Sequence, residues 1–437
     1  MLKQLAVGVI IAAGLVRQPA PAQAPFDNLQ RDRARQMLHD LEEGLQHHYY
    51  DPKYHGIDME ARFKAADAQL QTVNNLGAAL TTIAQTLDAL KDSHTFFLPP
   101  ARNTHRQYGY IQQMIGDHCF ITSVRPNRDA SEKLAAGDEV VAWQGYTPTR
   151  QTLWTMSYVF NTLLSLPVMN LTVRSPDGAT RKVEVTPKVV QERQLLDLTN
   201  DNDYWKLVRD QENGDRENRQ QLVNFADSLL IWKMPEFFMS DDEVDHLIKD
   251  ARKYQTLILD LRGNPGGLVK TLERLVGGVM DHDVTIAQRV GRKSDLKPQL
   301  AKSRGANVFS GKLMVLVDSR SASAAELFAR VVQLEHRGTV LGDHSSGSVM
   351  ESRRYQFHQG TDTQFFYGAS ITDADLIMGD GKSLEHIGVI PDEVILPSAA
   401  DLAASRDPVL ARAATLAGVE IDPVKAGQLF PIEWRKD

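Results

Sequence analysis

The segment Asp318–Glu326 (Asp-Ser-Arg-Ser-Ala-Ser-Ala-Ala-Glu) gathers serines and small residues directly after the apolar run Leu313–Val317. The apolar run predicts a buried strand, and the small residues predict a turn that opens a helix. A serine at the start of such a helix exposes its hydroxyl at the sheet edge, where free backbone amides can stabilise an oxyanion. Capping of the helix by serine explains the same pattern without catalysis. Taken alone, the segment favours the cap.

A second segment with chemical potential is Asp260–Gly267 (Asp-Leu-Arg-Gly-Asn-Pro-Gly-Gly), which ends the apolar strand predicted over Thr256–Leu261. Glycines let a backbone approach a ligand closely and present its amides. The segment lacks the lysine and the spacing of a phosphate-binding loop, which argues against a nucleotide. An ordinary Asn-Pro-Gly-Gly turn is the simpler explanation of this segment by itself.

In this order and spacing, the two segments resemble the carboxyl-terminal processing and tricorn-like serine peptidases, the S41 type. The shared signature is a strand with Asp-Leu-Arg-x-Asn-x-Gly-Gly, followed about 55 residues later by Ser-Ala-Ser-Ala-x-Glu. Gly388–Asp392 (Gly-Val-Ile-Pro-Asp) is similar to a third marker of these peptidases. Gly137–Gly145 (Gly-Asp-Glu-Val-Val-Ala-Trp-Gln-Gly) resembles the strand and turn of a PDZ domain. The resemblance covers the chain from about residue 30 to 400.

The resemblance implies that Ser323 is the nucleophile and that the amide of Ala324 contributes to an oxyanion hole. It assigns the second amide to Gly266 or Gly267, and we favour Gly266. In the Ser/Lys branch of these peptidases a lysine follows the nucleophile by 25 positions, but here that position is Ser348. A serine hydroxyl needs a base to react near neutral pH, so another group must serve.

The tricorn-like branch takes its base from a histidine that follows a serine, and it places a glutamate just before the Gly-Val-x-Pro-Asp marker. Ser93, His94 and Glu385 occupy the matching positions of this sequence. The resemblance therefore implies a tetrad in which Ser323 attacks and His94 acts as general acid/base. Ser93 would be the relay and Glu385 would orient it, offsetting the imidazolium charge. Considered alone, His94 would pass for a surface histidine at a helix end.

Hydrophobic periodicity predicts a multi-domain α/β protein. Helical stripes cover Ala34–Leu45 and Leu76–Leu90, and short strands with turns fill residues 105–190. Strands and helices alternate from residue 225 onward, which predicts a mainly parallel or mixed sheet, and residues 399–417 predict a surface helix. The expected regions are a signal peptide 1–24, an N-terminal helical region 26–100 contributing His94, a PDZ-like domain 103–190, a charged connecting segment 191–224, an α/β serine protease core 225–398 and a C-terminal helical extension 399–437.

The first residues predict export to the periplasm or the extracellular space. Lys3 precedes the apolar run Leu5–Val16, and Ala22-Gln-Ala24 supplies a small-x-small cleavage site. The run is shorter than the roughly 20 residues that span a bilayer, although an uncleaved anchor is the alternative. The single cysteine, Cys119, precludes an intramolecular disulfide, and we expect it to be a small buried hydrophobe.

Composition and missing motifs exclude several other classes of function. A net charge of −7 and the lack of a basic stripe argue against a nucleic-acid partner. No His-Glu-x-x-His run is present, and His47 and His48 would face different directions on a helix, so we expect no metal and no cofactor. The Gly-x-Ser-x-Gly elbow of lipases is missing as well. The sequence leaves open whether the chain forms a homo-oligomer.

Three functions fit these observations. The first is an exported serine endopeptidase that cuts polypeptides and captures their C-terminal segments by strand addition to the PDZ-like domain. The second is a catalytically silent ligand- or peptide-binding protein, since retinoid carriers share the fold. The third is a Ser/Lys peptidase that uses another lysine, such as Lys382. Because all four tetrad positions are occupied, the sequence favours the first function.

Overall fold

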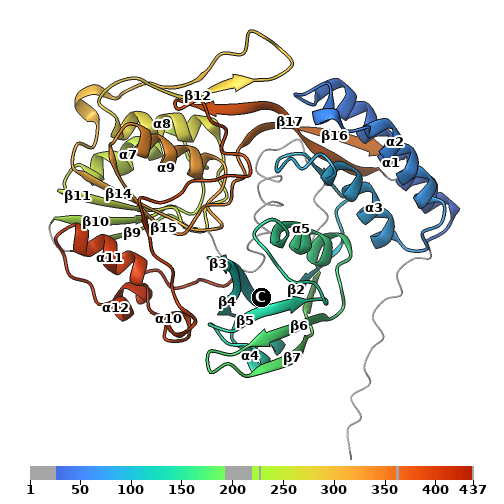
Figure 1. The fold of residues 1–437 in the computed structure, drawn as a ribbon, viewed down its shortest axis with the longest axis horizontal. Coiled ribbons are helices and arrows are strands. Elements are labelled where there is room, and N and C mark those ends of the chain that lie inside the picture. The colour runs from blue at the N-terminus through green and yellow to red at the C-terminus, as the bar shows by residue number, and fades with distance from the viewer. Residues whose placement is uncertain (1–25, 192–218, 226–227, 361–363, 436–437) are drawn as a thin grey trace, which may run out of the picture.

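The computed structural model describes residues 26–191, 219–225, 228–360 and 364–435. Its six-stranded sheet, called the central sheet below, lies on the left in Figure 1. Neighbouring strands from β10 to β18 run parallel, and only the edge strand β9 is antiparallel. This confirms the predicted α/β fold with a mainly parallel sheet. In spatial order the strands are β18 (Glu393–Val394), β15 (Gly338–Gly342), β14 (Lys312–Val317), β11 (Thr256–Asp260), β10 (Leu229–Lys233) and β9 (Gln221–Phe225).

Helices cover both faces of this sheet, so its inner strands are buried on both sides. All five residues of β11 are buried, which explains its continuous apolar run. Figure 1 shows one set of helices above the sheet and another, in red, below it. The first set is α7 (Asp241–Ala251), α8 (Val269–Val279) and α9 (Ala324–Leu334). The second set is α10 (Ala399–Ala403), α11 (Pro408–Leu416) and α12 (Pro423–Gln428).

The single surface helix predicted over residues 399–417 is wrong. Two helices occupy this stretch, and the second begins where Asp407 caps the amide of Leu410 and Pro408 takes the first helical turn. Leu410 and Ala413 are fully buried against the sheet, in one cluster with Met314 and other strand residues. The apolar face of α11 therefore completes the core rather than facing solvent.

A second sheet, with no counterpart in the sequence prediction, is built around the long hairpin of β16 and β17. These strands pair over the full length of β16, and β17 also pairs with β1 and β12. The N-terminal helices pack on this sheet and share its hydrophobic cluster. The helices predicted near residues 34–45 and 76–90 are confirmed. The elements are α1 (Asn28–His48), η1 (Tyr54–Gly56), α2 (Met59–Leu70), α3 (Leu76–Asp88), β1 (Phe96–Leu98), β12 (Val284–Val290), β13 (Gln299–Ala301), η3 (Gly305–Asn307), β16 (Met350–Gln359) and β17 (Phe365–Met378).

A third unit is the five-stranded antiparallel sheet β3–β7, which has its own hydrophobic cluster. It contains the short strands predicted within residues 105–190. Cys119 is buried there, and burial raises the pKa of its thiol to about 12, which fits the buried hydrophobe that we expected. The elements are β2 (Thr104–Gln107), β3 (Tyr110–Ile115), β4 (His118–Val124), α4 (Asp129–Lys133), β5 (Glu139–Trp143), α5 (Leu153–Ser157), the π-helical turn η2 (Tyr158–Leu163), β6 (Met169–Arg174), β7 (Thr180–Val185) and β8 (Lys188–Gln191).

The predicted signal peptide 1–24 and most of the charged connection 191–224 lie outside the described residues. Residues 221–224 of that connection belong to strand β9 (Gln221–Phe225) of the central sheet. Between residues 26 and 435, no described helix is both long and apolar enough to cross a bilayer.

The packing of α11 gives a test of the fold. Leu410→Ala should lower the free energy of unfolding by about 2–5 kcal/mol, because it leaves a cavity beneath the sheet. Val424→Ala on α12 is the matched control, since that valine is 41% exposed and should cost less than about 0.5 kcal/mol. Urea unfolding of both variants measures the difference. Equal losses would show that α11 does not belong to the core.

Candidate active site

Two turns meet at the carboxyl end of the central sheet because the strands that precede them are parallel neighbours. β11 pairs with β14, with Asp260 opposite Leu316. The glycine-rich turn 263–267 and the serine turn 318–323 therefore leave the same sheet edge. The Ala322 amide donates to the Asn264 carbonyl at 2.9 Å, which joins the two turns directly.

Ser323 stands at the start of α9 in a backbone conformation that non-glycine residues seldom adopt. Its φ is 54° and its ψ is −117°. Such strain costs on the order of 1–3 kcal/mol and is typical of functional positions. Two acceptors hold the Ser323 amide, the Ser348 carbonyl at 2.9 Å and Glu326 Oε2 at 3.0 Å. The hydroxyl-bearing residue itself is only partly buried.

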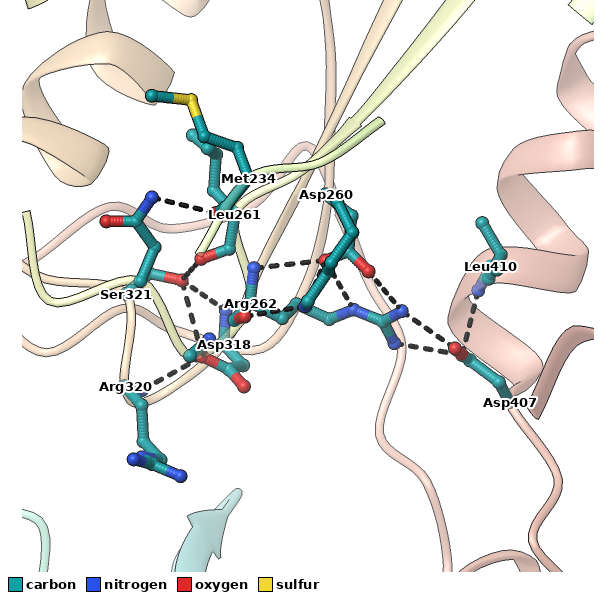
Figure 2. A network of polar contacts seen from close by, with 12 residues as sticks. Met234, Asp260, Leu261, Arg262, Asp318, Arg320, Ser321, Asp407 and Leu410 are labelled. Atoms are coloured by element: carbon teal, nitrogen blue, oxygen red, sulfur yellow. Dashed lines mark hydrogen bonds and ion pairs between the residues drawn. The ribbon is translucent and has the colours of Figure 1, made fainter. Parts of the chain in front are cut away.

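Ser321, the other serine of the motif, is a support for the turn. It is fully buried, and its hydroxyl donates to the Leu261 carbonyl at 2.8 Å (Figure 2). Asp318 Oδ1 accepts from the same hydroxyl and from the Gly263 amide at 2.8 Å. Of the two motif serines, Ser323 is therefore the one with an accessible side chain.

A buried ionic cluster anchors the glycine-rich turn from below. Figure 2 shows the Arg262 guanidinium between the carboxylates of Asp260 and Asp407, with contacts of 2.7–2.9 Å. Lys233 also approaches Asp260, at 3.1 Å. Burial opposes the ionisation of Asp260, but the charges of Arg262 and Lys233 outweigh it and hold the pKa of Asp260 well below its usual value. Because Asp407 caps α11, the cluster joins the turn to the lower helix layer.

Gly266 lies against Ser323, but its amide is already engaged. A Cβ on Gly266, whose φ is +96°, would lie 2.7 Å from the Cβ of Ser323, so only glycine fits. The Gly266 amide donates to Asn264 Oδ1 at 2.8 Å. In the described part of the chain, no hydrogen-bond acceptor contacts the amide of Gly267 or of Ala324. These two amides are therefore the ones free to bind an oxyanion.

Ser93, His94 and Glu385 form a continuous chain of hydrogen bonds. The Ser93 hydroxyl lies 2.8 Å from His94 Nδ1 and donates to Glu385 Oε2 at 2.8 Å. Glu385 Oε1 accepts from the Ser93 amide, also at 2.8 Å. Burial lowers the pKa of His94, although the charges of Glu385 and Asp92 act in the opposite direction. The imidazole is therefore neutral at pH 7 and able to accept a proton.

The segment Ser348–Val349 connects this chain to Ser323. The Ser348 carbonyl accepts from the Ser323 amide, and the next amide, that of Val349, donates to Glu385 Oε2 at 2.8 Å. Within the described residues, no hydrogen bond joins His94 directly to Ser323. The structure thus brings Ser93, His94 and Glu385 into contact and places Ser323 two backbone contacts away from Glu385.

The sequence reasoning missed Asp92, although this residue shapes the loop that carries His94. One oxygen of Asp92 accepts from the amides of His94 and Thr95, at 2.9 and 3.1 Å, and from the Thr372 hydroxyl at 2.7 Å. An aspartate that binds the amides two and three residues onward is a recognisable turn. The sequence Asp-Ser-His-Thr carries that signal. Asn264 lies in the glycine-rich segment and Glu326 in the serine segment, but the sequence alone predicted no role for either residue.

Within the described ranges, no three or more His, Cys, Asp and Glu side chains are grouped so that they could hold a metal ion.

The contact between Gly266 and Ser323 can be tested with two alanine substitutions. Gly266→Ala and Gly178→Ala both place a side chain at a similar positive φ, +96° and +90°, but nothing lies within 4 Å of the added Cβ at Gly178. Gly178→Ala should cost about 1 kcal/mol of unfolding free energy. Gly266→Ala should cost about 1–3 kcal/mol more, because its Cβ overlaps Ser323. Equal costs in urea unfolding would contradict this packing.

Comparisons with known proteins find similarity to peptidases over part of the chain. Residues 229–395 match the family model of peptidase family S41. The chain is 26% identical over 228 residues to the carboxyl-terminal-processing protease of Picosynechococcus sp., which covers 52% of this chain and 48% of that protein. It is 24% identical over 327 residues to the tail-specific protease of Haemophilus influenzae, covering 69% of this chain and 43% of that one. The chain thus spans less than half the length of these relatives.

The crystal structure of mature CPAF has the same fold. It superposes with a TM-score of 0.64 at 17% identity, covering 86% of this chain and 95% of that one. The matched residues 229–395 contain the glycine-rich turn, the serine turn and Glu385. On this combined evidence, residues 229–395 of the chain match peptidase family S41, and the chain shares the fold of mature CPAF.

Proposed function

We propose that this protein is a serine endopeptidase that hydrolyses polypeptides, with Ser323 as nucleophile and His94 as general acid/base. The observation that carries the proposal is the hydrogen-bonded chain from Glu385 through Ser93 to His94. The segment Ser348–Val349 links this chain to Ser323, a strained serine at a helix start, and nucleophilic catalysis pairs such a serine with a base. The two relatives named above, which are proteases by name, support the same activity.

In the proposed reaction, the Ser323 hydroxyl attacks the carbonyl carbon of the scissile peptide bond while His94 Nε2 accepts its proton. The tetrahedral oxyanion would be bound by the amides of Ala324 and Gly267, since Asn264 engages the Gly266 amide. His94 then donates the proton to the leaving amine, which leaves an acyl-enzyme on Ser323. Water, activated by His94, hydrolyses the ester and restores the serine.

Ser93 and Glu385 would act through His94 without touching the substrate. The Ser93 hydroxyl bridges His94 Nδ1 and Glu385 Oε2, so it fixes which imidazole nitrogen faces outward. The carboxylate of Glu385 offsets the charge that the imidazole gains during the reaction. The desolvation that lowers the pKa of His94 keeps the resting imidazole neutral.

Substrate capture by the antiparallel unit is the finer part of the proposal. β3 is the end strand of its sheet, and a PDZ-like domain binds an extended C-terminal segment at such an edge. The carbonyl of Met114 on β3 accepts from the Ser319 hydroxyl at 2.5 Å, and Gln113 donates to Asp318 at 2.7 Å. A peptide added to β3 would therefore lead toward the turn that carries Ser323.

The alternatives use the same residues differently. A Ser/Lys mechanism would need a lysine beside Ser323, but Lys382 is exposed on a turn and the Ser348 hydroxyl bonds to Ser346 at 2.9 Å. A silent binding protein would keep the fold and lack hydrolysis. We also propose that the protein is exported, on the strength of residues 1–24; the mass of its mature form tests this point.

Replacement of the nucleophile separates an enzyme from a silent scaffold. Ser323→Ala should reduce cleavage of an unfolded polypeptide by at least about 10³-fold and leave the fold intact. Ser348→Ala is the matched control, because that position makes its contacts to Ser323 through the backbone carbonyl. Mass spectrometry of the fragments measures cleavage. Hydrolysis by Ser323→Ala above a few per cent of wild type would remove Ser323 from the reaction.

The relay predicts a non-additive pair of substitutions. Glu385→Gln and Ser93→Ala should each lower kcat by about 10²–10⁴-fold with little change in KM, because orientation of His94 matters most in the transition state. The double variant should be no slower than the worse single variant. Steady-state kinetics of the four proteins provide the test. Full additivity would leave Ser323 and His94 as a simple dyad.

A further inference from the structure

Glu326 is a buried carboxylate that the proposed mechanism does not use. It lies one turn into α9, three residues after Ser323, and has no exposed surface. Its position in the motif suggested no role from sequence, because glutamate in the first turn of a helix ordinarily stabilises the helix dipole at the surface. A carboxylate that is wholly buried is expensive unless its oxygens are hydrogen-bonded or paired with a cation.

Among the residues that the structure describes, every side-chain hydrogen bond of Glu326 comes from a neutral donor on the two segments that flank the site. Oε2 accepts from the amides of Ser323 and Ser348, both at 3.0 Å. Oε1 accepts from the Gly347 amide at 2.7 Å and from the Ser345 hydroxyl at 2.6 Å. The carboxylate thus joins the nucleophile to the turn 345–348 by four hydrogen bonds, and no cation takes part in them.

The turn 345–348 and the residue that follows it also contact the part of the site that contains Glu385. The Ser348 carbonyl accepts from the Ser323 amide, and the Val349 amide donates to Glu385. The Ser345 hydroxyl also accepts from the Val389 amide at 2.6 Å, close in sequence to Glu385. The Ser/Lys branch would carry its lysine at position 348. In this chain, the turn that contains Ser348 instead connects Ser323 to Glu385 through backbone hydrogen bonds.

We propose that Glu326 is a positioning residue whose ionised carboxylate clamps Ser323 to the turn 345–348, and that efficient hydrolysis depends on this ionised form. The inference rests on the proposed peptidase function. When the carboxylate is protonated, its O–H becomes a donor that faces amide and hydroxyl donors. At least one of the four hydrogen bonds is then lost, and the strained conformation of Ser323 loses its support.

The ionisation of Glu326 falls in an accessible pH range. Burial raises the pKa of Glu326 to about 7, although its hydrogen bonds to Ser345, Gly347, Ser348 and Ser323 act in the opposite direction. Two other charged groups lie near the turn 345–348. Asp343 is paired with Arg150 at 2.6 Å, and Glu385 accepts hydrogen bonds from Ser93 and Val349. Beyond Glu385 lies His94, whose pKa is lowered below 6.5. The pKa of Glu326 is thus shifted upward and the pKa of His94 downward from their ordinary values.

Activity and stability should respond to this titration in opposite directions. Since the folded pKa of Glu326 exceeds its ordinary value of 4.5, its contribution to stability is fully present below that value and is lost as the pH rises through about 7. The ionised form that supports catalysis is thus the less stable one. A purely structural role would produce no such opposition between the two pH profiles.

Glu326→Gln is the decisive variant, because the amide is neutral at every pH and presents a donor as the protonated acid does. At pH 8 its kcat should fall by about 10- to 100-fold with KM little changed, as expected when the nucleophile is misplaced. At pH 5.5 the variant and the wild type should agree within about threefold, since both are then neutral at this position. The rise of the wild-type kcat with pH near 7 should be missing from the variant. Only the rise at lower pH that reflects His94 should remain.

Two further variants keep the test sharp. Glu335→Gln, at the opposite end of α9, is the matched control, because its carboxylate binds the exposed His282 at 3.1 Å and should leave the profile unchanged. Ser345→Ala keeps the charge of Glu326 but removes a hydrogen bond that lowers its pKa. Ser345→Ala should move the rise of kcat near pH 7 to higher pH. This variant replaces Glu326→Gln as the test if Glu326→Gln does not fold.

The outcomes distinguish the two levels of the proposal. If the wild type hydrolyses no polypeptide at any pH, the peptidase function fails and this inference fails with it. If the wild type is active and Glu326→Gln shows the same kcat at pH 8, or loses the same factor at pH 5.5 and pH 8, only the clamp is overturned. If the rise of kcat near pH 7 is not shifted in Ser345→Ala, the clamp is overturned as well.

Discussion

The parallel pairing of β11 with β14 is the constraint on which the site depends. Both strands are buried on two faces, where their side chains pack closely against fixed neighbours, so a slip in register would disrupt this packing. With Asp260 opposite Leu316, the two chains leave the sheet together and their turns come into contact. The position of Ser323 beside Gly266 thus follows from the packing of strands that contribute no functional side chain.

Carboxylates are held near this sheet edge in two physically different ways. Asp260 is surrounded by Arg262 and Lys233, whose charges keep it ionised at any ordinary pH. Asp260 is therefore a fixed anchor. Glu326 is bound only by backbone amides and a hydroxyl, which satisfy its oxygens without supplying a full positive charge. A carboxylate of this second kind remains able to take up a proton, so it can respond to its surroundings.

Much of the fold could be predicted from the sequence because the central strands and their helices carry strong local patterns. The runs at Thr256–Leu261 and Leu313–Val317 became neighbouring strands, as expected. The hairpin of β16 and β17 could not be predicted in this way. Residues 351–354 read Glu-Ser-Arg-Arg, without apolar alternation, and the strand exists because β17 pairs with it. The helix over 399–417 was misjudged because alanine-rich segments look alike whether they are buried or exposed.

The site shows a similar division. Family resemblance pointed to Ser93, His94, Glu385 and Ser323, and the structure places the first three in direct contact. Their catalytic roles stay a prediction. Asp92 carried a local turn signal that was overlooked. The contribution of Glu326 was invisible because its partners are mostly backbone amides, which every residue carries. Which amides a carboxylate meets depends on how distant loops fold, and no spacing of residue types records that.

The contact between Ser93 and Glu385 joins positions that are 292 residues apart in the chain. The chain between these two positions must close into a loop before the imidazole of His94 can be oriented. Closing so long a loop costs entropy, so we expect this contact to form late in folding. A nascent chain that still lacks its last fifty or so residues would already contain Ser323, His94 and Ser93 but not the glutamate that connects them. Partly synthesised chains would therefore lack an assembled centre. In the proposed peptidase, this long-range contact would delay proteolysis until Glu385 has reached Ser93, without any separate inhibitor.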